Sequence, residues 1–566
     1  MKYRLKNQTV GGMALALVIT AATVHSARAN VYATNIKLNG ATNDVTTGAG
    51  GNVSISYILN EPASGGVAVR ILSGNTTVRV INVAAGSAGT LRGANNMVWD
   101  GKDGVGANVP GGTYTVSITA ASTGYTNWTQ ITDDTNIGNA VFSCRGLDVN
   151  KNTNSPYYGR VFVGNAGVGP GYPSVVADTP GIQKLNADSS PADEGGFADG
   201  GYAWVGDGYS PWRIKIGADD KVYVEHWSGN GNIFAWDQQL SAGSMQNIMR
   251  DDNNPTPEPA PPVGPVNYQG LIRPSTPQGN LGGFFVTGSG TNNQVWMSDN
   301  NTGGWGIMHW NAQADGTLAV GLSPDIAVRA TAAHFAITNS DLDDSAFDVA
   351  LDNAGNIYVA QQPWNNDQFK IFKFSPYTGV SLTNAIWKAG DTLTNDANDV
   401  TSIAVNPAGT LVAVSLGTDQ QVQVLDGNTG TNVVSLSADG HAQMAVAWDN
   451  AGNLYNAFDG LAGSEGNWRA FSPPGANQAT TVAIEKVVVN APVLPHITSI
   501  KSSGGTVTID FTGSASDDAS AYVLQSAATV NGTFTDVAVT PIPLSPGVFR
   551  VSTAASGAIK FYRIKR

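Results

Sequence analysis

Short runs of alternating hydrophobic and polar residues recur along this chain from about residue 31 to its C-terminal end. Clear examples lie at residues 53–59, 67–72 and 113–119. Successive side chains of a β-strand point to opposite faces, so this alternation predicts strands with one buried and one exposed face. After residue 29, no long stretch has the apolar spacing of an amphipathic helix. The pattern therefore predicts an all-β protein.

A degenerate repeat occupies the middle of the chain. Each copy contains a hydrophobic strand, a turn and a second hydrophobic strand, most clearly at residues 347–360, 403–414 and 444–455. Weaker copies lie upstream, at residues 160–185, 214–236 and 293–310. Copies of three or four strands at this spacing are typical of β-propeller blades. Six copies are visible and residues 317–344 leave room for a seventh, while a β-helix, whose coils would be shorter, is the alternative fold.

The repeat, including the strand-turn-strand sequence at residues 353–358, resembles the NHL and YncE-like families of β-propellers. The resemblance implies a ring of small radial sheets over residues 138–490. A single blade cannot bury both faces of its sheet, so closure of the ring would stabilise the set. The proline-rich residues 253–262 are unsuited to a central strand, and we expect them to form a loop that projects from the ring.

The segments on either side of the repeat predict two small β-sandwiches. Within residues 30–124, the sequences at 97–104 and 109–114 resemble the Ig-like domain of flagellar hook-capping proteins, which implies a spacer or assembly role with Trp99 in the core. Residues 495–566 contain further alternating strands and resemble small fibronectin-like modules, which implies surface attachment. The expected fold is thus all-β, a six- or seven-bladed β-propeller flanked by two small β-sandwich domains.

Residues 1–29 have the pattern of an export signal. Three basic residues, Lys2, Arg4 and Lys6, precede an apolar run at 11–24 and a small-residue cleavage site at 27–29. We expect cleavage near Asn30 and a mature chain that is secreted, periplasmic or on the cell surface, with no membrane span; a retained anchor is the alternative. No later apolar stretch has the length of a membrane-spanning helix.

Composition narrows the choice of partners. The formal net charge is -13, and a protein that binds a nucleic-acid backbone needs clustered Lys and Arg, so nucleic acid is not an expected partner. The expected ligands are instead a glycan, on whose sugars aromatic side chains can stack, or a cell-surface protein. Cys144 is the single cysteine, so no intramolecular disulfide can form and packed cores must stabilise the domains.

Candidate chemistry is sparse in this sequence. Glu225 and His226 directly follow the predicted strand at residues 221–224, and a carboxylate beside an imidazole at a propeller face could exchange protons with a substrate. Trp227, His309 and Trp310 are candidate ligand-binding residues, since aromatic rings can stack on sugars. The plainer interpretation is that Glu225 and His226 form a loop-facing pair, while Trp227 and Trp310 pack between blades.

A calcium site is the one cofactor interpretation that the sequence offers. Asp148, Asn150 and Asn152 carry oxygen ligands at alternate positions, as at the start of a calcium-binding loop. The distal Glu of a helical calcium hand is lacking, so a turn between blade strands is the alternative. The histidines are not at zinc-ligand spacing, and no other cofactor is expected.

Two functions follow from these patterns. The first is a secreted, noncatalytic binding or surface protein that uses the propeller as its recognition platform. The second is a secreted carbohydrate-active lyase or hydrolase with its site in the propeller channel near Glu225 and His226. The scarcity of paired titratable residues favours the first, because the fold alone supports neither.

Overall fold

The computed structural model describes most of the chain after residue 30. The described residues are 31–42, 44–167, 180–204, 210–226, 232–250, 281–299, 306–312, 316, 318–319, 325–329, 346–361, 370–390, 400–437, 440–460, 466–475, 478–490, 493–515, 517–555 and 560–566. Within them the protein is all-β, as the alternating pattern predicts, and its helical segments are 3-10 turns of three residues. No helix in these ranges is long and apolar enough to cross a membrane.

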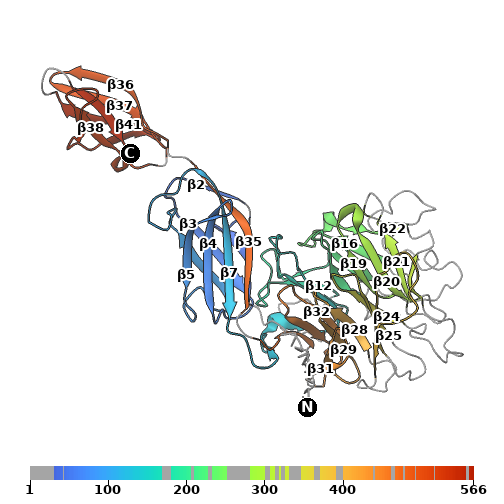
Figure 1. The fold of residues 1–566 in the computed structure, drawn as a ribbon. Coiled ribbons are helices and arrows are strands. Elements are labelled where there is room, and N and C mark those ends of the chain that lie inside the picture. The colour runs from blue at the N-terminus through green and yellow to red at the C-terminus, as the bar shows by residue number, and fades with distance from the viewer. Residues whose placement is uncertain are drawn as a thin grey trace, which may run out of the picture.

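Six small antiparallel sheets form the propeller (Figure 1). Blade 1 contains β10 (Cys144–Val149), β11 (Val161–Asn165), β12 (Gly181–Leu185) and β13 (Phe197–Ala198). Blade 2 contains β14 (Ile214–Ile216), β15 (Val222–His226), β16 (Asn232–Trp236) and β17 (Gln246–Asn247). Blade 3 contains β19 (Leu281–Thr287), β20 (Gln294–Asp299), β21 (Gly306–Asn311) and β23 (Asp325–Arg329).

The other three blades follow the same plan. Blade 4 contains β24 (Ala346–Leu351), β25 (Ile357–Gln361), β26 (Ile371–Phe374) and β27 (Trp387–Ala389). Blade 5 contains β28 (Val400–Val405), β29 (Leu411–Leu416), β30 (Gln421–Asp426) and β31 (Asn432–Ser437). Blade 6 contains β32 (Gln443–Trp448), β33 (Leu454–Phe458) and β34 (Gly466–Ser472), completed by β8 (Thr129–Gln130) and β9 (Ala140–Val141) from before blade 1.

The ring closes with six blades. The first strand of each blade contacts the first strand of the next, and β10 of blade 1 contacts β32 of blade 6. Since β8 and β9 pair with β34, the two ends of the propeller sequence are joined in one sheet. The seventh blade allowed for at residues 317–344 is not formed by the described part of that segment, because β23 is the outer strand of blade 3 and β22 (Leu318–Ala319) pairs with β18 (Met249–Arg250).

The repeated sequence builds the turn between the first and second strands of a blade, here called its first turn. In blade 4, Asp352 accepts hydrogen bonds from the backbone N–H groups of Ala354 and Asn356, and from the hydroxyl of Tyr358 at 3.1 Å. Blade 6 repeats this arrangement with Asp449, Asn453 and Tyr455. The repeat therefore encodes a capped turn rather than a catalytic motif.

The first sandwich contains a strand from far along the chain. One sheet has the order β1 (Ala33–Leu38), β3 (Val53–Leu59), β6 (Gly93–Trp99). The other has the order β2 (Val45–Thr47), β35 (Gln478–Val489), β7 (Gly112–Ser122), β4 (Gly66–Ser73), β5 (Thr76–Val83), and Figure 1 shows β35 in orange among the blue strands. Trp99 is fully buried in this core, as expected, against Tyr114.

Strand β35 changes the expected layout. Residues 478–489 fall inside the range 138–490 expected for the propeller, but they pair with β7 along its whole length, from Gln478 opposite Ser122 to Val489 opposite Gly112. An alternating strand fits any sheet with a free edge, so its sequence does not say which domain it joins. The propeller is thus inserted into the first sandwich rather than placed after it.

Side chains of the sandwich also pack against the first turns of blades 6 and 1. Tyr32 lies 5.0 Å from Tyr158 between ring centroids, and its hydroxyl lies 3.0 Å from that of Tyr455. A Cβ at Gly159 would lie 2.6 Å from the Tyr32 ring, so a larger residue would prevent this close approach. Lys37 pairs with Asp193 at 2.7 Å nearer the surface. The sandwich is therefore docked on two of the six blades.

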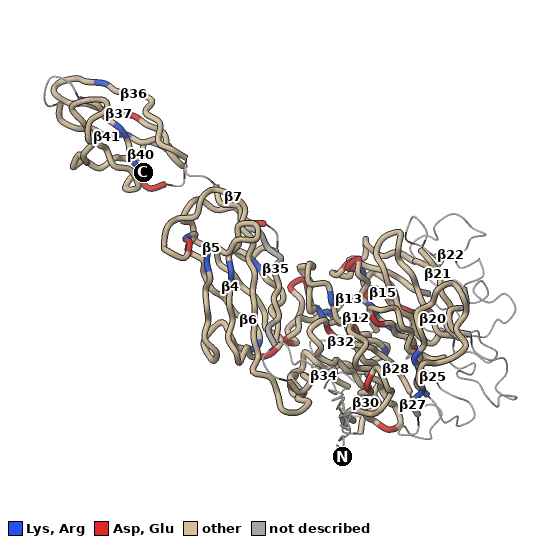
Figure 2. The backbone as a smooth tube through the Cα atoms, in the orientation of Figure 1, with Lys and Arg blue, Asp and Glu red and all other residues tan. Residues whose placement is uncertain are grey.

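A second sandwich ends the chain and lies beyond the first one in Figure 1. Its sheets have the orders β36 (His496–Ser503), β37 (Thr506–Thr512), β41 (Val548–Ala554), β40 (Ile542–Ser545) and β39 (Thr535–Asp536), β38 (Val523–Ala527), β42 (Phe561–Lys565). Phe511, Tyr522 and Phe549 pack in its core. Figure 2 shows acidic and basic residues interspersed over the two sandwiches and the propeller.

Candidate functional site

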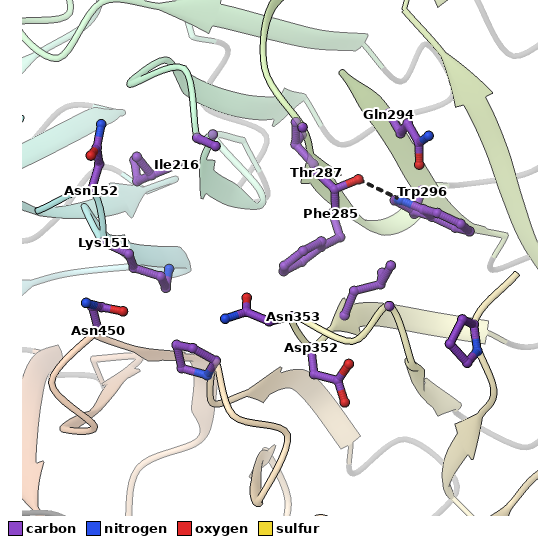
Figure 3. A pocket seen from close by; sticks show the side chains of 18 of the residues that line it. Lys151, Asn152, Ile216, Phe285, Thr287, Gln294, Trp296, Asp352, Asn353 and Asn450 are labelled. Atoms are coloured by element: carbon purple, nitrogen blue, oxygen red, sulfur yellow. Dashed lines mark hydrogen bonds between the residues drawn. The ribbon is translucent and has the colours of Figure 1, made fainter. Parts of the chain in front are cut away.

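The first turns of all six blades meet at a cavity of about 630 Å³ at one end of the ring axis, here called the mouth (Figure 3). Five blades each contribute the second residue after their first strand, and blade 3 contributes the residue directly after β19. These residues are Lys151, Ala218, Gly288, Asn353, Pro407 and Asn450. Similar turn positions thus surround the mouth, and the residue there varies among the blades, with Asn in both blade 4 and blade 6.

Most residues that line the mouth come from blades 2, 3 and 4. Ile216, Val286 and Leu351, the last or next-to-last residues of the three first strands, line it there, together with Phe285 and Trp296 of blade 3 and Tyr377 after β26. Small residues leave this side open. At Gly288 the φ is +82° and a Cβ would lie 2.1 Å from the carbonyl oxygen of Asn292, so the backbone itself requires glycine.

Aromatic rings form one wall of the mouth. The indole N–H of Trp296 donates to the hydroxyl of Thr287 at 3.3 Å, which fixes the ring at the edge of the cavity. His309 lies behind it, with ring centroids 4.3 Å from Trp296 and 5.4 Å from Tyr377. Of the predicted ligand-binding residues, His309 is therefore buried beside the mouth and supports two rings that line it.

Trp310, another predicted ligand-binding residue, does not line the mouth. Trp310, next to His309 on β21, points to the other face of blade 3 and is buried with Tyr223 and Phe284 between blades 2 and 3. This placement agrees with the packing interpretation. Trp227 lies outside the described residues.

The structure does not bring Glu225 and His226 together. They are consecutive in β15, so their side chains point to opposite faces of blade 2. His226 stacks on Trp204 at 6.0 Å in the cluster between blades 1 and 2. Glu225 shares its face with Tyr223, which packs against blade 3. A proton exchange that requires both groups at one substrate is not supported by this geometry.

Glu225 lies near a buried arginine that links several blades. Burial raises the pKa of Glu225 well above its usual value, an effect that the positive charge of Arg213 opposes. Arg213 donates to the carbonyl oxygens of Arg145 in blade 1, at 2.6 Å, and of Thr401 in blade 5, and its Nε lies 3.6 Å from Asp348 in blade 4. These contacts make Arg213 a structural link at the ring axis.

The expected calcium ligands already have protein partners. Asp148 accepts hydrogen bonds from the backbone N–H groups of Val149 and Ile216 and pairs with the ammonium group of Lys151. Because Lys151 places a positive charge on this carboxylate, the loop is unsuited to a cation. No cluster of three His, Cys, Asp or Glu residues that could hold a metal occurs among the described residues.

Asn150 and Asn152, the other two expected calcium ligands, have different roles. The Asn150 side chain donates to Asp220 at 3.1 Å and accepts from the N–H of Asn152, so it fastens the first turn of blade 1. Asn152 lines the mouth. The mouth residues Asn353 and Asn450 were missed by the sequence interpretation, although their shared repeat position was a signal that could have found them.

The described fold is that of a β-propeller protein with an Ig-like domain. Residues 42–124 match the family described as the FlgD Ig-like domain. That match covers most of the first sandwich as far as β7. No curated protein matches the sequence of this chain.

Several solved structures resemble the chain at low identity. A nidogen/laminin complex matches at 8% identity and a TM-score of 0.30, covering 54% of this chain and 84% of that one. The β-propeller domain of Myceliophteria thermophila Cps50 (Swd1) matches at 11% and 0.35, covering 58% and 96%. Kluyveromyces lactis Hsv2 matches at 10% and 0.29, covering 56% and 71%.

Proposed function

We propose that this chain is a noncatalytic recognition protein that binds its ligand at the mouth of the propeller. The observation that carries this proposal is the convergence of all six first turns on one cavity of about 630 Å³. Cavities of roughly 300–1,000 Å³, lined by apolar and aromatic side chains with a few polar groups, are typical ligand sites. Turn positions that carry five different residue types in the six blades give such a site its own shape.

The lining of the mouth supports binding rather than catalysis. Its charged side chains, Lys151 and Asp352, are both engaged within the protein, Lys151 with Asp148 and Asp352 with its own turn and Tyr358. General acid–base catalysis needs a titratable group within reach of the substrate. The alternative, a lyase or hydrolase at Glu225 and His226, finds no support in side chains that point to opposite faces of β15.

The remaining parts of the chain fit a protein displayed outside the inner membrane. In this proposal residues 1–29 direct export, the first sandwich holds the propeller as a spacer, and the last sandwich attaches the protein to a surface. Tyr32 and Lys37 connect the first sandwich firmly to blades 6 and 1, as a spacer requires. The linear arrangement in Figure 1 places the propeller far from the C-terminal sandwich.

A binding screen with the mature chain, residues 30–566, tests the proposal. The labelled protein is applied to arrays of extracellular glycans and of surface proteins, beside the variants Ala218→Trp and Ala408→Trp. Both alanines are exposed in first turns, but only Ala218 lines the mouth. We expect a ligand that wild type and Ala408→Trp retain and Ala218→Trp loses. Equal binding by all three proteins, or none by any, would overturn the proposal.

A further inference from the structure

The mouth presents no unpaired charge to a ligand. Lys151 lies within hydrogen-bond distance of Asp148 and of the carbonyl oxygen of Val149, while both oxygens of Asp352 accept hydrogen bonds from its own turn. A ligand with a phosphate, sulfate or carboxylate would meet a Lys151 charge that Asp148 already balances, and it would also face the carboxylate of Asp352. The described lining therefore favours an uncharged ligand.

Side-chain amides supply the polar groups instead. Asn353 and Asn450 are exposed at the mouth, and Gln294 lines it from blade 3. In the described part of the chain, none of these three amides has a side-chain hydrogen bond to the protein. An amide offers a donor and an acceptor together, and a sugar hydroxyl likewise donates and accepts. The amides thus match a surface rich in hydroxyl groups.

A flat apolar surface lies between these amides. Figure 3 shows the Phe285 ring near the middle of the cavity, with Asn353 beside it and Asn450 on the side of Lys151. Phe285 and Tyr377 are partly exposed, whereas Trp296 is nearly buried behind them. An aromatic face flanked by amides is suited to the apolar C–H face and hydroxyl rim of a pyranose ring.

We propose that the ligand held at the mouth is the end of an uncharged glycan, an inference that rests on the proposed function. One pyranose ring stacks on Phe285, while Asn353 and Asn450, which lie on the same side of that ring in Figure 3, bond hydroxyls of the glycan. The rest of the glycan leaves over blades 2 and 3, where Ala218 and Gly288 lack bulky side chains. Blades 4 and 6 thus provide polar recognition, blade 3 provides the stacking ring, and Ala218 and Gly288 leave the exit open.

The test measures binding of the mature chain to matched pentasaccharides. The uncharged probes are pentamers of glucose, mannose, xylose and N-acetylglucosamine, and the acidic probe is a galacturonate pentamer. The variant Asn353→Ala/Asn450→Ala removes the two mouth amides. Its control, Asn154→Ala/Asn428→Ala, removes two exposed asparagines that do not line the cavity.

We expect at least one uncharged pentamer to bind, and the mouth variant to weaken this binding on the order of tenfold, since each hydrogen bond contributes modestly. The control variant should bind the uncharged pentamer as tightly as wild type does. The galacturonate pentamer should not bind to any of the proteins. If only galacturonate or a surface protein from the array binds at the mouth, the inference of an uncharged glycan is wrong, while the recognition role stands. If no probe or array ligand responds to Ala218→Trp, the recognition role itself fails.

Discussion

At the scale of single residues, buried carboxylates occupy two different settings in this protein. Asp352 and Asp449 cap first turns, where several N–H and O–H groups donate to each. Glu61 lies at the junction of sandwich and propeller, where Tyr125 donates to its Oε2 at 2.8 Å and Ser472 at 3.4 Å. Its Oε1 has no hydrogen-bond partner among the described residues.

Glu61 should make the junction less stable as the pH rises. Burial raises its pKa to about 7, and the nearby carboxylate of Asp449 adds to the rise, while the hydroxyls of Tyr125 and Ser472 oppose it. An unfolded Glu has a pKa of about 4.3, so the folded state holds the proton more tightly. The contribution of this group to stability is complete below pH 4 and is lost as the pH rises through 7, by roughly 3 kcal/mol.

The variant Glu61→Gln tests this pH dependence because its amide stays neutral. We expect the melting temperature of the mature chain to fall between pH 5 and pH 8 more steeply in wild type than in Glu61→Gln. Burial also raises the pKa of Asp449, to about 6. Both proteins should therefore keep a smaller decrease of melting temperature with pH that comes from Asp449. Parallel curves for the two proteins would show that Glu61 is not the titrating group.

Arg213 should contribute more to stability than a surface arginine. It is fully buried, and its guanidinium holds backbone carbonyls of different blades beside Asp348. Removal of one partner from a buried ion pair costs about 3–5 kcal/mol, so Arg213→Met should lower the denaturation midpoint clearly. Arg550→Met, which breaks an exposed pair with Asp510, is the control and should change little. Equal effects of both variants would contradict the linking role of Arg213.

At the scale of elements, β35 decides how the chain is divided. It lies between β2 and β7 in the sheet of the first sandwich, and its residues Val482, Val487 and Val489 are buried in that core. Ser122 and Gln478 are opposite each other, so the chain leaves for the propeller and returns at neighbouring points. Such an insertion leaves the sandwich intact only if both of its parts are present.

A shortened chain can test this division. Residues 31–124 alone should fail to fold cooperatively, because β2 and β7 would lose the strand between them. The same segment joined by a short Gly-Ser linker to residues 478–490 should fold, as measured by circular dichroism and thermal melting. A cooperative transition of residues 31–124 alone, at the same temperature as the joined form, would show that β35 is dispensable.

The sequence predicted strands well where the repeat is regular. Residues 347–360, 403–414 and 444–455 form paired strands as expected, because alternation and a capped Asp or Asn turn specify a hairpin locally. The short strands β8 and β9, of two residues each, carry no pattern of their own. The sheet that β35 joins depends on contacts across hundreds of residues, which local alternation does not encode.

The candidate site was harder to predict than the fold. Glu225 and His226 were chosen because they are adjacent in sequence, but adjacency within a strand separates their side chains. Asn353 and Asn450 are far apart in sequence and meet only because the ring brings equivalent turns together. In a closed ring, equivalent repeat positions therefore say more about a shared site than neighbouring residues do.

At the scale of the whole molecule, the sandwich and the mouth are connected through blades 6 and 1. Tyr32 contacts Tyr455 in β33 and Tyr158 in the first turn of blade 1. The first turns of these two blades also carry Asn450 and Asn152 to the edge of the mouth. The first sandwich thus supports one side of the proposed binding site, while the side at blades 2 and 3 faces away from these contacts. This asymmetry matches the exit path proposed for the ligand.

The most direct test of a mouth that holds a ligand is protection of an introduced thiol. Native Cys144 is fully buried, so Ala218→Cys and Ala408→Cys each add one accessible thiol, inside and outside the mouth respectively. The rate of labelling by a bulky maleimide is measured with and without the ligand found in the array screen. The account predicts that saturating ligand slows labelling of Ala218→Cys at least tenfold and leaves Ala408→Cys unchanged. Labelling of Ala218→Cys at the same rate with and without bound ligand would contradict it.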